Sequence, residues 1–418
     1  MRRAGRGGPP EQHRRPRGVP ARQRDRRRLR GQRGRLRRGI LRSRPARRGQ
    51  GGEGHGVNGA PRLAALRGRL AEEKVDAFLV TDPVNVAYVT GFDGVFDSEP
   101  ASACLVTPGA ATVYTDFRYA EALKAQASSS GWSVVVVAGP LNVRVCEDVA
   151  AAGLGVLGVE SSVPYGRFKY LSEHLEGRVL AADEWVERVR SVKTADELER
   201  IAAAAELADE AMAHGIALVA PGRTEREVAI EIEVHLLRAG SEGVPFPPIV
   251  AAGPNAARPH ARPSDRRMGR GEPVIIDLGA RVGGYCSDLT RTVVAGTADG
   301  RVRELYAATL AAQEAGLAAV RAGVAAKDAD AVAREVLGAR GLAEAFGHGL
   351  GHGVGLEVHE LPSMGARSRE VLAAGMVVTV EPGVYLPAWG GVRIEDLVAV
   401  EEGGCRLLSR APKELAET

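Results

Sequence analysis

The sequence predicts an α/β protein of two domains, a smaller one followed by a larger one. At 418 residues the chain is too long for one ordinary core. Up to about residue 185, short apolar strand-like runs alternate with helical stretches, and after residue 195 two long helical patterns precede strands and turns. The composition, with 44% hydrophobic and 26% charged residues, is typical of a globular protein. The sequence holds no run of about 18 apolar residues, so we expect no membrane span.

Residues 1–56 differ from the rest of the chain in composition. They hold 20 arginines, no lysine and three acidic residues, a charge of +17, which leaves −13 on the remainder of a chain whose net charge is +4. Without aromatic residues the segment cannot bury enough apolar surface to fold, and we expect it to be disordered. We interpret it as the product of a mis-assigned start, with the natural protein beginning near Val57.

Two other interpretations of residues 1–56 stay open. An arginine-rich arm could neutralise the phosphates of a nucleic acid. A transit peptide is also rich in arginine, but it should be rich in serine, and Ser43 is the only serine in the segment. Nucleic-acid binding is therefore expected only if this segment belongs to the native protein.

The first domain, expected over residues 57–190, begins with a helix. Leu63, Leu66 and Leu70 recur at helical spacing, which predicts a helix over residues 61–73. The apolar residues 76–81 predict a strand that ends at Asp82-Pro83. Further strands are predicted at residues 103–106, 111–114 and 134–137, and helices after Phe117 and Leu141. This alternation indicates a partly parallel sheet.

The second domain, expected over residues 191–418, opens with two helices. The first is predicted over residues 196–219 and is ended by Pro221-Gly222. Thr224 and Glu227 have the spacing of a capping box, which predicts a second helix through about Ala239. Strands and turns follow, with one more helix expected near residues 302–322.

The four cysteines are spread along the chain. Cys104, Cys146, Cys286 and Cys405 show no C-x-x-C spacing. This pattern fits thiols kept reduced, argues against a cysteine-bound metal, and leads us to expect a cytoplasmic protein.

Two aspartates occur in a predicted hairpin of the second domain. Asp277 ends an apolar strand, Gly283-Gly284 forms the turn, and Asp288 lies at the start of the returning strand. An ionised carboxylate beside a buried strand is costly unless it is paired or binds a metal. The alternative is that both aspartates cap backbone amides in turns.

Three of the nine histidines fall within twelve residues. His348, His352 and His359 alternate with glycines in the segment 346–362. Glycine permits close backbone approach, and imidazole is both a common metal ligand and a proton carrier near neutral pH. The segment is therefore predicted to be functional.

Two glutamates complete the set of candidate ligands. Glu381 ends an apolar strand and precedes a Pro-Gly turn, with no partner nearby in the sequence. Arg393 and Glu395 are two positions apart on a predicted strand and should share one face. A salt bridge between these two residues is the alternative explanation for Glu395.

The set Asp277, Asp288, His352, Glu381 and Glu395, in this order, resembles that of the pita-bread metallopeptidases of the aminopeptidase P and prolidase type. The resemblance extends to residues 85–92, which are similar to the N-terminal domain of that family, and to residues 190–197, which are similar to its linker. It implies a pita-bread catalytic domain preceded by a smaller creatinase-like α/β domain.

The resemblance also implies a reaction and a site. The expected activity is hydrolysis of the bond between an N-terminal residue and a following proline, by a hydroxide that bridges two divalent ions. Asp288 and Glu395 would bridge the ions, Asp277 would bind one, and His352 with Glu381 the other. Oxygen-rich ligands favour Mn²⁺, with Co²⁺ and Zn²⁺ as alternatives.

Other residues receive roles from the same resemblance. Glu381 would act as the general base, and His260 with His359 would hold the scissile carbonyl. Arg393 and Tyr385 would orient carboxylates, and Tyr385 and His348 would also contact the substrate. Candidates for binding a dipeptide's carboxylate are Arg118, Arg258 and Arg262. The length of the body is similar to that of short bacterial members, which implies a homodimer.

Four other functions share this fold. Creatinase lacks the ligand set, and methionine aminopeptidase lacks the first domain. A non-catalytic pita-bread module that only binds peptides generally loses ligands, whereas all five are present here. A peptidase of the same fold with another specificity also remains open.

Overall fold

The computed structural model describes residues 59–418 except 93, 98 and 129. The interpretations of residues 1–56 fall outside this part of the chain. The first domain is built on a six-stranded sheet with the order β4-β3-β2-β1-β5-β6. Its strands are β1 (Ala77–Val80), β2 (Ala103–Val106), β3 (Ala111–Thr115), β4 (Ser133–Val136), β5 (Val156–Glu160) and β6 (Arg178–Ala182). Strand β1 is parallel to β5 and antiparallel to β2, which confirms the partly parallel sheet.

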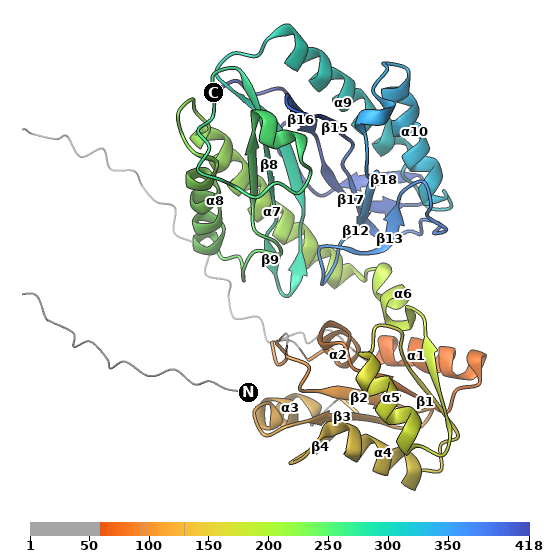
Figure 1. Ribbon diagram of the computed structural model, residues 1–418. Helices are drawn as coiled ribbons and strands as arrows, with labels where there is room; N and C mark the ends of the chain where they lie inside the picture. The colour runs from red at the N-terminus through yellow and green to blue at the C-terminus, as the bar shows by residue number, and fades with distance from the viewer. Residues whose placement is uncertain (1–58, 93, 98, 129) are drawn as a thin grey trace, which may run out of the picture. The chain divides into compact units, whose positions relative to one another are not determined.

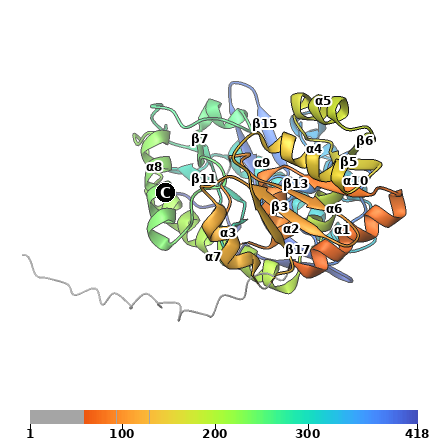
Figure 2. The ribbon, with the colours of Figure 1, turned by 90° about the horizontal axis from the view of Figure 1, so that it is seen from below.

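Helices cover both faces of this sheet (Figure 2). They are α1 (Ala60–Glu73), α2 (Pro83–Thr90), α3 (Ala120–Ala127), α4 (Leu141–Ala151), α5 (Tyr165–His174) and α6 (Trp185–Ser191). Because side chains alternate along a strand, β1 contributes to two cores. Phe78 and Val80 pack in the cluster that holds residues of α1, α2, α3 and α6, whereas Ala77 and Leu79 pack with residues of α4 and α5.

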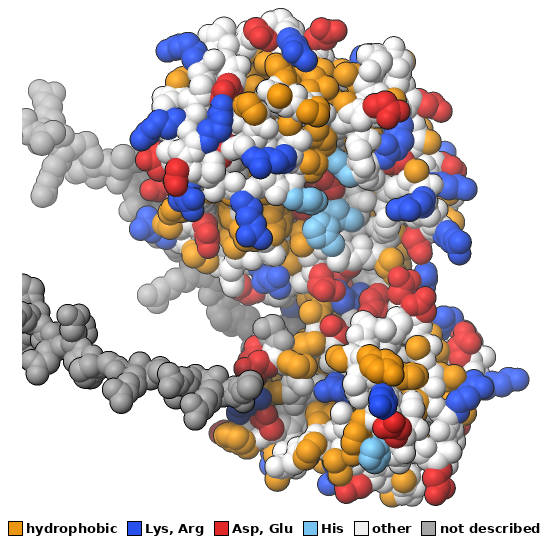
Figure 3. Space-filling model, in the orientation of Figure 1, with side chains coloured by type: hydrophobic (Ala, Val, Ile, Leu, Met, Phe, Trp, Pro, Cys, Tyr) orange, Lys and Arg blue, Asp and Glu red, His pale blue; other side chains and the backbone are white. Residues whose placement is uncertain are grey.

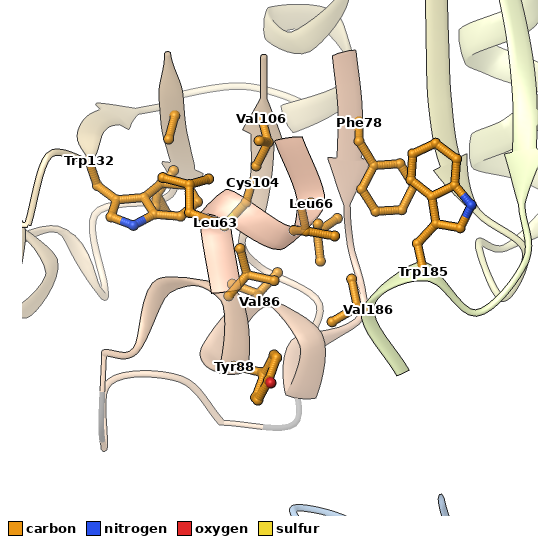
Figure 4. Packing of buried hydrophobic residues seen from close by; sticks show 14 of the residues in the cluster. Leu63, Leu66, Phe78, Val86, Tyr88, Cys104, Val106, Trp132, Trp185 and Val186 are labelled. Atoms are coloured by element: carbon orange, nitrogen blue, oxygen red, sulfur yellow. The ribbon is translucent and has the colours of Figure 1, made fainter. Parts of the chain in front are cut away.

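The first of these clusters is centred on aromatic and leucine side chains (Figure 4). The rings of Phe78 and Trp185 are stacked with their centroids 4.9 Å apart. Leu63, Leu66 and Leu70 are buried here, so the helix predicted from their spacing is confirmed.

The second domain opens with the two predicted helices, α7 (Ala195–Leu218) and α8 (Glu225–Ala239). Both have capping boxes, Thr194 with Glu197 and Thr224 with Glu227, which fix where the helices begin. A three-stranded sheet with the order β11-β8-β7 contacts these helices. It contains β7 (Ile249–Ala252), β8 (Glu272–Leu278) and β11 (Leu289–Ala295).

The predicted hairpin between β8 and β11 is confirmed. The two strands pair antiparallel and continue into the short strands β9 (Arg281–Val282) and β10 (Tyr285–Cys286). Gly283 and Gly284, with φ of 55° and 80°, form the turn between them. Positive φ at two successive residues is the reason that glycines occupy the turn.

A second sheet completes the second domain beside α9 (Gly300–Ala319) and α10 (Ala326–Gly338) (Figure 1). Its order is β13-β12-β14-β17-β18, and β15 pairs with β16 next to it. The strands are β12 (Gly351–Gly353), β13 (Glu360–Met364), β14 (Val377–Val380), β15 (Gly383–Leu386), β16 (Gly390–Arg393), β17 (Asp396–Glu401) and β18 (Gly404–Leu407). Two short 3-10 helices lie at Gly253–Ala257 and Ala343–Ala345.

The structure corrects two expectations. Two helices, α9 and α10, follow β11 where one was expected. The buried residues of α10 recur at helical spacing, but most of them are alanines, and Asp330 is one of the set Ala326, Ala329, Asp330, Ala333 and Leu337. The strand expected to carry both Arg393 and Glu395 is broken, because β16 ends at Arg393 and β17 begins at Asp396.

Among the described residues, no helix is both long and apolar enough to cross a membrane.

Candidate metal centre

The hairpin brings its two aspartates to one place in the second domain. Asp277 lies near the end of β8, directly opposite Thr290 of β11, and Asp288 immediately precedes β11. Both side chains are nearly buried. The pairing register of a buried hairpin therefore sets the separation of the two carboxylates.

The other three candidate ligands converge on the same place from the second sheet. His352 lies on β12, Glu381 follows β14, and Glu395 lies between β16 and β17. One ligand atom from each of Asp288, His352 and Glu395 lies within 4.8 Å of the other two. His352 Nε2 is 3.2 Å from Glu381 Oε1. Asp277 and the other four candidate ligands line one cleft.

The buried carboxylates need a cation. Burial raises the pKa of Asp288 well above its ordinary value, and the charges of Glu395 and Asp277 raise it further. Burial and then Glu381 have the same effect on the pKa of Glu395. Oδ1 of Asp277 and Oε1 of Glu395 are buried with no hydrogen-bond partner in the described chain. Orphaned carboxylate oxygens of this kind are what divalent cations bind, so the residues fit a metal centre.

His352 and Glu381 form an ion pair on the other side of the cluster. Burial opposes a charged His352, but the hydrogen bond to Glu381, the charge of Glu381, the Gly353 carbonyl and the charge of Asp277 together outweigh burial and leave the pKa of the imidazole raised. Burial also opposes the charge of Glu381, and His352 overcomes this and lowers its pKa to about 2. His352 Nδ1 lies 3.1 Å from its neighbour's carbonyl, Gly353 O. A proton on Nδ1 would leave the Nε2 lone pair free for a metal ion.

Arg393 forms its ion pair with Asp277 and not with Glu395. Its Nη2 donates to Asp277 Oδ2 at 2.6 Å, and its Nε donates to Thr290 Oγ1 at 3.1 Å. Thr290 Oγ1 in turn donates to Glu395 Oε2 at 2.7 Å. The expected alternative, a salt bridge between Arg393 and Glu395, is therefore wrong, and Glu395 is left with one oxygen free for another partner.

Tyr385 and His348 extend this network. Arg393 Nη1 donates to Tyr385 Oη at 2.9 Å, and the same hydroxyl lies 2.9 Å from His348 Nε2. Burial lowers the pKa of His348, so its ring is neutral near pH 7 and can accept from the hydroxyl. His348 and Arg393 line the cleft, and Tyr385, which is not among the residues that line it, contacts both of them through its hydroxyl.

A cleft of about 660 Å³ opens over the cluster. His260 and His359 both line it and are both exposed. The ring of His359 lies 4.2 Å from that of His352. Burial and the neighbouring His352 lower the pKa of His359, and His260 lowers it further. Figure 3 shows histidine side chains gathered beside acidic ones on this domain.

The arginines singled out for carboxylate binding lie in different surroundings. Arg262 lines the cleft. Arg258 donates to Asn255, and Arg118 is exposed and paired with Glu99 and Asp116. Of the three, only Arg262 is placed at the site.

A second cavity, which the sequence analysis did not predict, adjoins the cleft. It has a volume of about 620 Å³ and shares His348, Gly349 and Ser363 with the cleft. Arg334, Arg367 and Arg369 line it. Arg334 is paired with Asp330, whereas no carboxylate in the described chain pairs with Arg367 or Arg369. In the sequence, the available signal for this cavity was the run Arg367-Ser368-Arg369, which follows the histidine-rich segment closely.

The raised pKa of Asp288 predicts how pH changes the stability of the metal-free protein. Below about pH 4 the carboxyl is protonated in the folded and unfolded chain alike. As pH rises through the raised folded pKa, wild type loses stability, by about 1.4 kcal/mol for each unit by which the folded value exceeds the unfolded one. Asp288→Asn does not titrate at this position, so we expect its advantage in stability over wild type to be larger at pH 8 than at pH 4.5.

Urea unfolding of chelator-treated wild type and Asp288→Asn at both pH values measures this difference. A difference in the free energy of unfolding that stays the same at the two pH values would contradict a raised pKa for Asp288.

Comparison with known proteins agrees with this geometry. Residues 62–192 match the Creatinase/Prolidase N-terminal domain, and residues 199–402 match Metallopeptidase family M24. The uncharacterized peptidase YqhT of Bacillus subtilis is 37% identical over 356 residues, which are 85% of this chain and 99% of that protein.

Solved structures are similar over the same length. The Xaa-Pro dipeptidase from Bacillus anthracis is 35% identical, with a TM-score of 0.81 over 86% of this chain and 99% of that one. The X-Pro aminopeptidase from Thermotoga maritima is 33% identical, with a TM-score of 0.76 over 85% of this chain and 99% of that one. With relatives of this identity along nearly its whole described length, and with a creatinase-type domain before its catalytic domain, the chain belongs to metallopeptidase family M24.

Proposed function

We propose that this protein is an Xaa-Pro peptidase that prefers dipeptides. The observation that carries the peptidase function is the convergence of four carboxylates and one imidazole, nearly buried, at the base of an open cleft. Relatives named Xaa-Pro dipeptidase, such as that of Pyrococcus furiosus, support the proline specificity. The bond to proline lacks an N–H, so it suits an enzyme that does not depend on that donor.

Five residues would hold two divalent ions. Asp288 and Glu395 would be shared by both, Asp277 would bind one, and His352 with Glu381 the other. When bound, such a pair of ions lowers the pKa of a water and polarises a carbonyl group. Arg393 fixes Asp277 and Thr290 fixes Glu395, each through one carboxylate oxygen, which leaves the other oxygen available.

The proton and the substrate are handled by residues that line the cleft. Glu381, which stays ionised at neutral pH, would accept the proton of the attacking water and pass it to the proline nitrogen. His260 and His359 would donate hydrogen bonds to the carbonyl oxygen as its negative charge develops. Tyr385 and His348 would shape the same pocket, with the Tyr385 hydroxyl fixed by Arg393.

The preference for dipeptides rests on the second cavity. A dipeptide places its C-terminal carboxylate one residue from the scissile bond, whereas a longer peptide has an amide there. Arg367 and Arg369, which have no carboxylate partner in the described chain, lie beside the cleft and can bind that carboxylate. Arg262, which lines the cleft itself, is a third candidate.

The metal-dependent function and the length preference can be tested together. We expect the chelator-treated protein to be inactive and Mn²⁺ to restore cleavage of Xaa-Pro faster than of Xaa-Pro-Xaa. Arg367→Gln or Arg369→Gln should lower kcat/KM for the dipeptide by roughly ten- to hundredfold, the cost of losing a hydrogen bond to a charged group. The same variant should leave cleavage of the dipeptide amide nearly unchanged, because the amide offers no carboxylate.

The proline specificity and the preference for dipeptides can be rejected separately. Two bound metal ions without cleavage of any Xaa-Pro substrate would retain the metal centre and reject the proline specificity. Equal losses on the dipeptide and on its amide would show that the arginines do not bind the carboxylate.

We also propose Mn²⁺ as the native metal, a homodimer as the assembly, and the cytoplasm as the location. The oxygen-rich ligand set favours Mn²⁺ over softer ions. The four free thiols, three of them buried, are compatible with a reducing compartment. Metal analysis of the native protein and light scattering of the purified chain would check the first two, and cell fractionation the third.

A further inference from the structure

Two cations of the segment between the domains are buried beside the catalytic cleft. Arg190 lies near the end of α6, and Lys193 follows that helix by two residues. Their side chains are only 2% and 1% exposed. Burying a charged group is costly unless a partner of opposite charge is fixed nearby. Arg190 and Lys193 therefore require a fixed anionic partner.

That partner is Glu360. Its Oε2 accepts from Arg190 Nη2 at 2.7 Å and its Oε1 accepts from Lys193 Nζ at 2.6 Å. The Glu360 side chain is 4% exposed, and a Cβ at Gly355 would lie 2.3 Å from Oε1, so the glycine makes room for the carboxylate. Arg190 Nη2 also donates to Glu357 at 3.0 Å. Each oxygen of Glu360 is thus held by a different buried cation.

The two glutamates flank His359. Glu360 follows it directly and opens β13, and Glu357 precedes it by two positions. In the described chain, no side chain or backbone group hydrogen-bonds the His359 ring. The His359 ring lies 4.2 Å from that of His352, so its place over the cleft depends on the position of the backbone at 357–360.

The same arginine also contacts the first domain. Arg190 Nη1 donates to Asn85 Oδ1 at 2.7 Å. Asn85, on α2, is fully buried and donates from Nδ2 to Glu160 at 2.8 Å and to Glu187 at 2.7 Å. On the other side of the segment, Lys193 N donates to Gly375 O at 2.9 Å. Asn85 and Arg190 each belong to a segment whose sequence resembles the family but which has no part in the metal centre.

We propose that Arg190 and Lys193 are positioning residues for the hydrolysis, holding His359 over the metal cleft through the carboxylate of Glu360. The inference rests on the proposed function, because His359 is given its role there. It also gives the first domain a task, because Asn85 of that domain anchors Arg190. A displacement of about 1 Å in a group that contacts the reacting carbonyl can cost up to a hundredfold in rate.

The test compares Lys193→Met with a matched control, Arg62→Met. Lys193→Met leaves Glu360 paired with Arg190, so the chain should still fold. Arg62 is also buried and donates to Glu197 Oε1 at 2.6 Å and to Tyr88 O at 2.7 Å. It lines a cavity together with Glu357 and Val358, but it forms no hydrogen bond or ion pair with the described residues 357–360. We expect Lys193→Met to lower kcat about ten- to hundredfold with bound metal unchanged. Arg62→Met should lose comparable stability to urea but keep kcat within about twofold of wild type.

A double-mutant cycle with His359→Asn separates positioning from a general structural effect. If Lys193 acts through His359, adding Lys193→Met to His359→Asn should change kcat by no more than about twofold. The same fold loss in both backgrounds, or wild-type kcat in Lys193→Met, would overturn the proposal.

A spectroscopic measurement keeps this inference separate from the proposed activity. In histidine-labelled protein loaded with Zn²⁺, the His359 ring resonance, assigned with His359→Asn, should shift in Lys193→Met and not in Arg62→Met. If wild type cleaves no Xaa-Pro peptide but this shift is seen, the proposed function fails and the positioning stands. An unshifted resonance in Lys193→Met would reject the positioning whatever the activity.

Discussion

Replacing Glu381 by glutamine is expected to lower kcat for Xaa-Pro hydrolysis by about 10²- to 10⁴-fold, the usual contribution of a general base. Glu381 follows the apolar strand β14, and its backbone N–H donates to Leu350 O at 2.8 Å. Its Oε1 accepts from Thr379 Oγ1 at 3.1 Å and lies 3.2 Å from His352 Nε2. Glutamine has nearly the same shape, so it keeps this frame but can neither accept the proton nor carry the charge.

The protonation state of Glu381 supports this expectation. Although burial opposes its charge, His352 lowers its pKa to about 2, so the carboxylate is available as a base across the neutral range. The measurement is kcat of the Mn²⁺-loaded variant, with the metal content determined on the same sample. Glu401→Gln, a change of the same type at an exposed ion pair with Arg406, is the control and should have wild-type kcat. If Glu381→Gln kept more than about a tenth of wild-type kcat, another group would have to be the base.

Local signals in the sequence were sufficient for much of the fold. The capping boxes at Thr194 and Thr224 fix helix starts through side chains three residues away, and Gly283-Gly284 fixes a turn by its own backbone preferences. Such features depend only on near neighbours in the chain. The helix α10 was missed although its buried positions recur at helical spacing, because this stripe consists mostly of alanines and includes the charged residue Asp330.

The candidate ligands could be predicted from the sequence for a different reason. Each is a charged or titratable residue at the end of an apolar strand or among glycines. There, the residues next to it in the sequence do not offset the cost of burying it. What the sequence could not show is which partner each group finds. Arg393 pairs with Asp277, 116 positions away, and not with Glu395. Arg190 and Lys193 reach Glu360 more than 160 positions away, so only the folded chain reveals those contacts.

The largest loss of stability is expected from Asp396→Asn. Asp396 opens β17 directly after the candidate ligand Glu395, and its side chain is 2% exposed. Its Oδ1 accepts from Arg291 Nη2 at 2.8 Å, and its Oδ2 accepts from Gln313 Nε2 and Lys413 Nζ, each at 2.9 Å. An asparagine would turn an NH₂ group towards these donors and leave Arg291 buried without its counter-charge.

Arg291 cannot escape to water to avoid this. It is 2% exposed, and besides Asp396 it donates to the carbonyls of Pro412 at 2.9 Å and Ala411 at 2.6 Å, which belong to the C-terminal segment. Removing one partner of a buried ion pair costs about 3 to 5 kcal/mol, whereas an exposed pair contributes about 1 kcal/mol or less. We therefore expect Asp396→Asn to lower the free energy of unfolding of the metal-free protein by about 3 to 5 kcal/mol, and Glu401→Gln to lower it by less than about 1 kcal/mol.

Urea unfolding of the three chelator-treated proteins compares the two pairs directly. Because Arg291 also donates to the carbonyl of Glu395, the same change should weaken metal binding, measured as a higher Mn²⁺ concentration for half-maximal activity. The loss of stability and the weaker metal binding would have one cause. The side chain of Arg291, which extends from β11, would lose its ion pair at the start of β17. A loss in Asp396→Asn no larger than in Glu401→Gln would show that the C-terminal carbonyls and Gln313 hold Arg291 without Asp396. The pair would then contribute little to either the fold or the metal centre.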